Sequence, residues 1–118
     1  MIFEKKDIIV SSTMGLCVVA DITKLSADKT APIAYYVLKS YYDKSKVAYI
    51  PVENHEVELR DPMYRDAAEA CFDEYKKGYS MDPHYEPDEA EIGEVAYVMG
   101  VSIEELKKQA GAPTKEDE

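Results

Sequence analysis

The chain has 118 residues, of which 24 are acidic and 14 basic, so its formal charge is −10. This length fits one domain or two very small ones, and 46% hydrophobic with 32% charged residues is typical of a globular rather than a disordered chain. The sequence has no apolar run near the roughly 20 residues of a membrane span, no signal-peptide-like start and only two distant cysteines, so we expect a cytoplasmic protein.

The negative charge belongs to the second half of the sequence. Residues 1–60 hold eight basic and eight acidic residues and are neutral, whereas residues 61–118 hold six basic and sixteen acidic residues and carry the whole −10. Such asymmetry suggests two modules with different partners. It also argues against broad electrostatic binding of nucleic acid by the second half, because phosphate contacts need a basic face.

The first sixty residues have the pattern of short strands. Alternating and β-branched apolar residues predict strands at 8–10, 16–23, 33–41 and 46–50. Gly15 lies in a predicted turn after the first of these strands, and Pro51 ends the last. Closely spaced strands of this length favour a small, strongly bent sheet or barrel.

After Asp61-Pro62 the spacing of apolar residues becomes helical. Residues 63–77 predict a helix that ends at Gly78, followed by a loop over 79–87. The apolar stripe of this helix consists of Tyr64, Ala67, Ala68, Cys71 and Tyr75.

Two more helices are predicted from capping residues. Asp88 caps a helix that runs through Met99, with Glu91 in the capping-box position, and Gly100 stops it. Ser102 opens a last helix to about Ala110, before a frayed tail. The apolar face of the second helix is Ile92, Val95, Ala96 and Met99.

No catalytic constellation is visible in the sequence. His55 and His84 have no Cys or Ser at a suggestive spacing, and both cysteines are interpreted as small buried hydrophobic residues. One loop mixes metal-ligand types but is interpreted as hydrated; its residues are Asp82, His84, Glu86 and Asp88. We therefore expect neither an enzyme nor a bound cofactor or metal.

Half of the ten tyrosines lie on or beside the predicted hairpin of the third and fourth strands. They are Tyr35, Tyr36, Tyr41, Tyr42 and Tyr49. Either β-propensity with cross-strand packing or an exposed aromatic contact surface explains them. Alternation places Tyr35 and Tyr36 on opposite faces of the strand, so one of them points away from the sheet core.

Residues 94–106 have the packing positions of a helix-turn-helix. A second helix that reads DNA needs basic and amide side chains at its start, and here Glu104 and Glu105 stand there. The interpretation is a pair of helices at a steep angle, with DNA binding by residues 88–110 as the third of three functional hypotheses.

Residues 1–61 resemble the RNA-polymerase-interacting domain of CarD-type bacterial transcription regulators, which is also found in transcription-repair coupling factors. The specific motifs are Tyr35-Tyr36-Val37-Leu38-Lys39 and Ile50-Pro51-Val52-Glu53-Asn54, in this order and about fifteen residues apart. Weaker matches are Met1-Ile2-Phe3 with Asp7, Gly15, Val19–Ile22 and Leu59-Arg60. The likeness covers about half of the chain.

The resemblance implies a small SH3-like or Tudor-like β-barrel over residues 1–61. With the acidic region of about three helices that the residue pattern predicts over 62–118, we expect an α+β protein. The resemblance also implies that the barrel binds the β subunit of RNA polymerase by adding a strand at an exposed edge, placed here at residues 46–50. The partner-binding residues implied by the likeness are Lys24, Leu25, Lys46, Val47 and Tyr49.

Two positions depart from the pattern of that family. Tyr49 stands where the family often has a basic contact residue, and Lys6 stands where it has a glycine before Asp7. The second half shows no match to the basic, DNA-contacting domain of full-length regulators, so no DNA contact is carried over. A protein-interaction adaptor with another partner is the second functional hypothesis, and the oligomeric state stays open.

Overall fold

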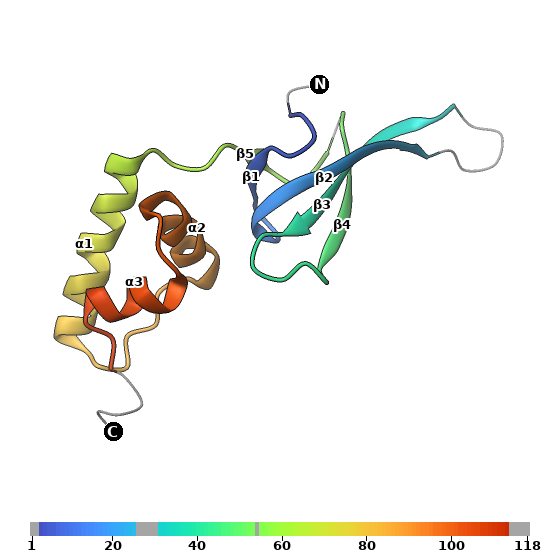
Figure 1. The fold of residues 1–118 in the computed structure, drawn as a ribbon. Coiled ribbons are helices and arrows are strands. Elements are labelled where there is room, and N and C mark those ends of the chain that lie inside the picture. Colours follow the sequence, from blue (N-terminus) through green and yellow to red (C-terminus); the bar gives the residue numbers. More distant parts are fainter. Residues whose placement is uncertain (1–2, 26–30, 54, 114–118) are drawn as a thin grey trace. The chain divides into compact units, whose positions relative to one another are not determined.

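A computed structural model describes residues 3–25, 31–53 and 55–113. The chain divides into two compact units, Met1–Pro62 and Met63–Glu118, one residue beyond the expected division after Asp61. The first is called the sheet unit and the second the helical unit, and Figure 1 shows both. Together they make a mixed α+β protein, as the sequence predicts.

The sheet unit is one antiparallel sheet with the strand order β4-β3-β2-β1-β5. Its strands are β1 (Ile8–Ser11), β2 (Gly15–Leu25), β3 (Ile33–Ser40), β4 (Val47–Pro51) and β5 (Leu59–Arg60). A shift of register in β2 between Val19 and Asp21 marks a β-bulge, which bends a strand and increases its twist. The last two residue pairs of β2 and β3, Lys24 with Ala34 and Leu25 with Ile33, lie beyond the pairing of β3 with β4, so the two strands extend there as a ribbon (Figure 1).

The sheet is not closed into a barrel. Closure needs a pairing between the two outer strands, but β5 is only two residues long and pairs with β1, and β4 pairs with β3. Both therefore remain edges of the described sheet. The expectation of a closed barrel is corrected on this point, because the sequence pattern predicts the strands but not a pairing between the first and last of them.

Strand alternation buries one face of the sheet. Tyr36 and Leu38 of β3 are 1% and 0% exposed, and the Tyr36 ring meets the edge of Phe3 at a centroid distance of 5.7 Å. Tyr35 is half-buried on the opposite face, as the alternation predicts. The core of this unit consists of Phe3, Ile9, Cys17, Val19, Tyr36, Leu38 and Ile50.

A tight turn precedes β1. Lys6 has φ +80°, and among the described residues it is the one non-glycine residue with positive φ. Its N–H donates to Val19 O at 2.7 Å, and the Asp7 carboxylate accepts from Glu4 N at 2.8 Å. The backbone at Lys6 is thus held in the left-handed region, which glycine adopts without strain.

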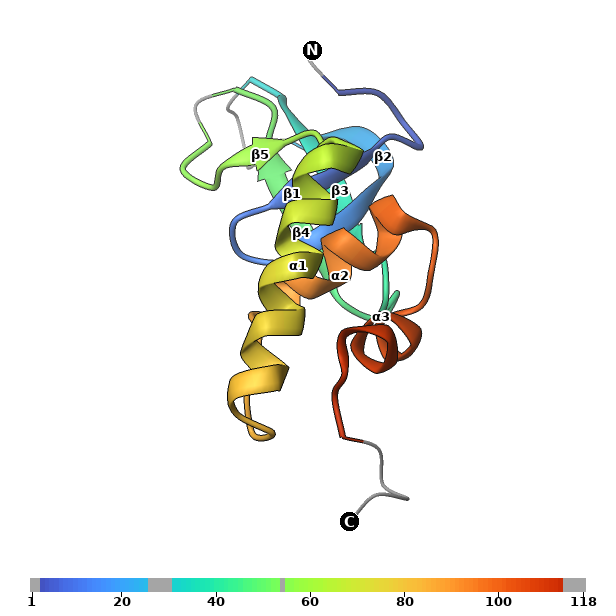
Figure 2. The same cartoon turned by 90° about the vertical axis from the view of Figure 1, so that its left-hand side faces the viewer.

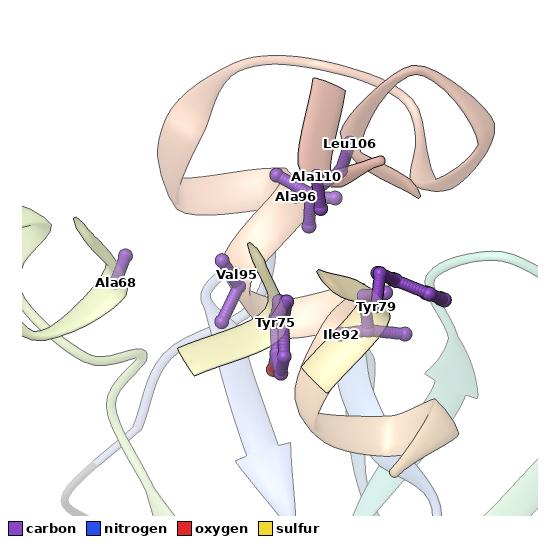
Figure 3. Close-up of a cluster of buried hydrophobic side chains, with 8 residues drawn as sticks. All are labelled: Ala68, Tyr75, Tyr79, Ile92, Val95, Ala96, Leu106 and Ala110. Atoms are coloured by element: carbon purple, nitrogen blue, oxygen red, sulfur yellow. The ribbon is translucent and has the colours of Figure 1, made fainter. Parts of the chain in front are cut away.

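The helical unit contains α1 (Arg65–Met81), α2 (Glu89–Met99) and α3 (Ile103–Ala110). As the sequence predicts, Asp88 and Ser102 cap α2 and α3 by accepting from Glu91 N and Glu105 N, and α2 ends at Gly100. The last helix ends at Ala110, and Gly111, which the sequence analysis placed in the tail, is its C-cap with positive φ. All three helices contact one another, and Figure 2 shows them from a second side. Their buried side chains form one cluster, drawn in Figure 3: Ala68, Tyr75, Tyr79, Ile92, Val95, Ala96, Leu106 and Ala110.

The first helix differs from the prediction at both ends. It passes through Gly78 and ends at Met81, so Tyr79 lies in the helix and is buried rather than in a loop. A Cβ at Gly78 would lie 2.5 Å from the ring of Tyr85, so this glycine serves close packing inside the helix instead of ending it. Tyr64, predicted in the apolar stripe, is 85% exposed because it is the N-cap residue of α1.

A buried carboxylate joins α2 to the start of α1. Glu94 is 1% exposed, and its Oε2 accepts from the backbone N–H of Met63 at 2.7 Å. Met63 stands just before Tyr64, whose side chain makes no cap hydrogen bond. The Glu94 side chain therefore supplies a hydrogen-bond acceptor just before α1, where the N-cap side chain supplies none.

Candidate protein-binding site

The candidate site is the free edge of the sheet unit at β4. Within the described residues β4 pairs with β3 and with no other strand. Val47 and Tyr49 are 44% and 54% exposed, and Lys46 is exposed just before the strand. An unpaired edge with exposed side chains is the kind of surface to which an extended peptide adds as a further strand.

The hydrogen-bond register shows which backbone groups of β4 point outward. Ser40 N donates to Lys46 O at 3.0 Å and Val52 N donates to Ala34 O at 2.9 Å, so the even-numbered residues bond to β3. Along an antiparallel strand, residues that bond to the neighbouring strand alternate with residues whose backbone groups point away from it. Residues 47, 49 and 51 therefore direct their backbone groups to the free edge. Because residue 51 is a proline, this edge offers two N–H donors, those of Val47 and Tyr49.

The same alternation puts an apolar strip on the outer face of the sheet. Tyr49 pairs with Val37, and Leu25 pairs with Ile33 two alternations further along β3. Leu25 and Ile33 are 46% and 51% exposed. We call the exposed residues Leu25, Ile33, Val47 and Tyr49 the outer strip.

The five residues expected to bind a partner fall into two groups. Lys46, Val47 and Tyr49 lie together at β4, whereas Lys24 and Leu25 are the last residues of β2. Leu25 lies about 13 Å along the sheet from the level of Tyr49, which is the length of four residues of β3. Alternation also turns Lys24 to the opposite face from Leu25. The strip residue that the sequence reasoning missed is Ile33, which the alternation Ile33, Tyr35, Val37 would have placed on the outer face.

The hairpin that leads into β4 is basic and well ordered. Ser45 donates to the Asp43 carboxylate through its backbone N–H and its hydroxyl, and these hydrogen bonds hold the pKa of Asp43 below its usual value. Lys39, Lys44 and Lys46 are exposed around this turn. Beside it, the exposed rings of Tyr41 and Tyr42 pack edge to face with centroids 5.0 Å apart.

Nothing in the described part of the chain points to an enzyme. Residues 3–25, 31–53 and 55–113 contain no group of three or more side chains placed to hold a metal ion. His55 Nδ1 lies 2.6 Å from Val57 O, and His84 is exposed in the loop after α1. Within the same ranges, no helix combines the length and apolar character needed to cross a bilayer.

Both cysteines are free thiols in apolar surroundings. Cys17 is fully buried, and burial raises the pKa of its thiol to about 11. Cys71 is partly buried, and burial together with neighbouring carboxylates raises its pKa as well. A raised pKa leaves little thiolate at neutral pH, which is the opposite of a reactive cysteine.

Residues 94–106 span the end of α2, Gly100 with its positive φ and the first half of α3, and the two helices contact each other. Glu104 and Glu105 are exposed in the first turn of α3 and bring negative charge where a recognition helix needs positive charge. No observation favours DNA binding by this helix.

A scan against models of known protein families finds no match to the chain, and neither does a search of curated proteins.

Proposed function

We propose that the protein is a non-enzymatic, CarD-like transcription regulator that binds the β subunit of bacterial RNA polymerase through the edge strand β4. The proposal includes an open form of the SH3-like or Tudor-like fold for the sheet unit and a cytoplasmic location. It rests on two observations. Two sequence motifs resemble the CarD-type domain, and the outer edge of β4 is unpaired within the described residues, as strand addition by a partner requires.

The single observation that carries the proposal is the register of β4. The motif Ile50-Pro51-Val52-Glu53 covers the end of the edge strand, and Tyr35–Lys39 is the strand that pairs with it. The two motifs that carry the resemblance are thus neighbours in the sheet, and one of them leaves its outer side unpaired. Strand addition at such an edge supplies backbone hydrogen bonds, and the flanking side chains supply specificity.

The turn before β1 adds a second, independent support. The family has a glycine at the position of Lys6, and the backbone of this chain is left-handed there. Lys6 thus stands in a turn that favours glycine. Asn54 and Met1-Ile2, which belong to the resemblance, lie outside the described residues.

Binding to purified RNA polymerase β subunit tests the proposal. The full chain should bind, and Tyr49→Pro should abolish binding because it removes one of two outward N–H donors and the exposed ring together. Tyr49→Ser keeps the donor and removes only the ring, so it should weaken binding less. Glu69→Gln on α1 is the control that should bind like the unchanged chain. Failure of the unchanged chain to bind at micromolar concentration would refute the proposal.

An adaptor with a different partner is the second candidate function. The observation that favours it is Tyr49, an exposed aromatic residue where the CarD-type domain often has a basic contact. This candidate predicts that the same Tyr49→Pro change abolishes binding to a protein other than polymerase. The two candidates share the edge and differ only in the partner that competes for it.

A further inference from the structure

The helical unit contains a groove that the proposed function does not use. It has a volume of about 520 Å³ and lies between the end of α1, the loop over residues 82–88 and the C-terminal end of α3. Two tyrosines and three prolines form its apolar lining: Tyr79, Tyr85, Pro83, Pro87 and Pro113. We call it the tyrosine–proline groove.

The wall of this groove is built by packing and is not a loose loop. Tyr85 meets the Tyr79 ring edge to face, with centroids 5.2 Å apart and an interplanar angle of 88°. The missing Cβ of Gly78 gives the Tyr85 ring room to lie directly against α1. Pro87 is buried, and Asp82 holds the loop by accepting from His84 N at 2.9 Å. The groove is thus preformed, which lowers the entropy cost of binding.

The rim of the groove is acidic. Residues 82–89 contain four carboxylates and no lysine or arginine, and two of the four, Glu86 and Glu89, line the groove. Lys107 is the one lysine or arginine among the residues that line the groove, and its Nζ lies 3.5 Å from Glu89 Oε1. Residues 63–113 as a whole hold twelve acidic and five basic residues, so a cationic ligand is attracted from a distance and at the rim.

We propose that the tyrosine–proline groove binds an extended, arginine- and proline-containing segment of a partner protein. Proline-rich segments are preformed as polyproline II helices and dock in aromatic-lined grooves. A guanidinium group pairs with carboxylates and also stacks on tyrosine rings, so the two tyrosines and the two glutamates suit the same side chain. This inference concerns the helical unit alone and stands or falls separately from polymerase binding.

Removing either of two neighbouring charges, Glu89 or Lys107, should change the affinity for a cationic peptide in opposite directions. Glu89→Gln removes a carboxylate from the rim, so binding of a cationic peptide should weaken about two- to fivefold. Lys107→Gln removes the like charge and releases Glu89, so binding should strengthen by a similar factor. Tyr85→Ala removes an aromatic wall and should weaken binding about tenfold or more.

The experiment is a titration of the full chain with a short acetylated peptide of alternating arginine and proline, followed by calorimetry and by NMR of backbone amides. A peptide with glutamate in place of arginine is the ligand control. Glu69→Gln is the matched charge control, because Glu69 is exposed on α1 ten residues before Tyr79, about 15 Å away. We expect the arginine peptide to bind, binding to fall with added salt, and amide shifts at Tyr79, Tyr85 and Ala112.

Four results would overturn the proposal. The first three are absence of binding by the arginine peptide, equal binding of the arginine and glutamate peptides, and amide shifts confined to residues outside the groove. The shifts are measured on the unchanged protein, so they decide the question even if Tyr85→Ala does not fold. Binding of the arginine peptide that is weakened as much by Glu69→Gln as by Glu89→Gln would show attraction to the acidic unit in general, and would also refute the groove.

Discussion

The two units of this chain offer different surfaces to a partner. The sheet unit, in the neutral half, presents backbone donors at β4 beside the exposed side chains Val47 and Tyr49. The helical unit satisfies its backbone within helices and caps, and presents a hollow with an acidic rim instead. The two proposals thus assign different kinds of recognition to the two units, strand addition to the sheet unit and a charged groove to the helical unit. Each depends on a separate core.

Separate cores predict separate unfolding. Leu106→Ala should destabilise the helical unit by about 2–5 kcal/mol, because Leu106 is fully buried there, and should leave the sheet unit intact. Leu38→Ala is the matched change in the sheet unit and should do the reverse. Hydrogen exchange of backbone amides, resolved by residue, measures both. Equal loss of protection in the two units after either change would show one cooperative fold.

The close contact at Gly78 provides the next largest effect. In an exposed helix position alanine is better than glycine by about 1 kcal/mol, but here its Cβ would collide with the Tyr85 ring. Gly78→Ala should therefore destabilise the helical unit by about 1–3 kcal/mol. It should also displace Tyr85, which tyrosine ring resonances report. An increase of the unfolding midpoint by Gly78→Ala would contradict this account of the groove wall.

Alkaline pH should weaken both units through their buried acids. Cys17 titrates near 9.0 when unfolded and near 11 when folded, so its stabilisation is complete below pH 9 and is lost as pH rises toward 11, about 1 kcal/mol by pH 10. In the helical unit, burial and the hydrogen bond from its hydroxyl to Glu91 raise the pKa of Tyr75.

Urea unfolding between pH 7 and 10.5 measures this loss for each unit. Cys17→Ala should flatten the pH dependence of the sheet unit, and Tyr75→Phe that of the helical unit. A sheet unit whose stability is constant up to pH 10.5 would contradict the assignment to Cys17.

The smallest expected effect is a gain in the sheet unit. Lys6→Gly removes the strain of a left-handed lysine, and the greater freedom of glycine in the unfolded chain offsets part of the gain. The net stabilisation should be about 0.5–1 kcal/mol, seen as a higher urea midpoint of the sheet unit alone. Lys5→Gly is the control, and it should stabilise nothing because Lys5 has an ordinary φ.

The sequence predicts most of the local structure, for physical reasons that are visible in particular residues. Asp88, Gly100 and Ser102 act within three or four residues, so both ends of α2 and the start of α3 follow from the local sequence. The end of α1 depends instead on the contact between Gly78 and Tyr85, which no local pattern contains. Closure of the sheet likewise depends on pairing of distant strands, and the short β5 does not reach β4.

The candidate surfaces follow the same division. Alternation puts Val47 and Tyr49 on one face of β4, because a period of two is a local property, and it puts Ile33 on the same face of the sheet for the same reason. The tyrosine–proline groove joins residues more than thirty positions apart, from Tyr79 to Pro113. In the sequence it is visible only as an acidic loop with two prolines, which is also the pattern of a hydrated loop.

The hydrogen bond from Met63 to Glu94 sets where a working fragment of the second unit has to begin. A fragment that starts at Met63 turns this backbone donor into a charged amino terminus, and one that starts at Tyr64 removes this donor to the buried Glu94 side chain. The amide at residue 63 exists as such only when residue 62 precedes it. Pro62 packs in the first unit, but its peptide bond to Met63 creates the amide that the second unit uses in this hydrogen bond.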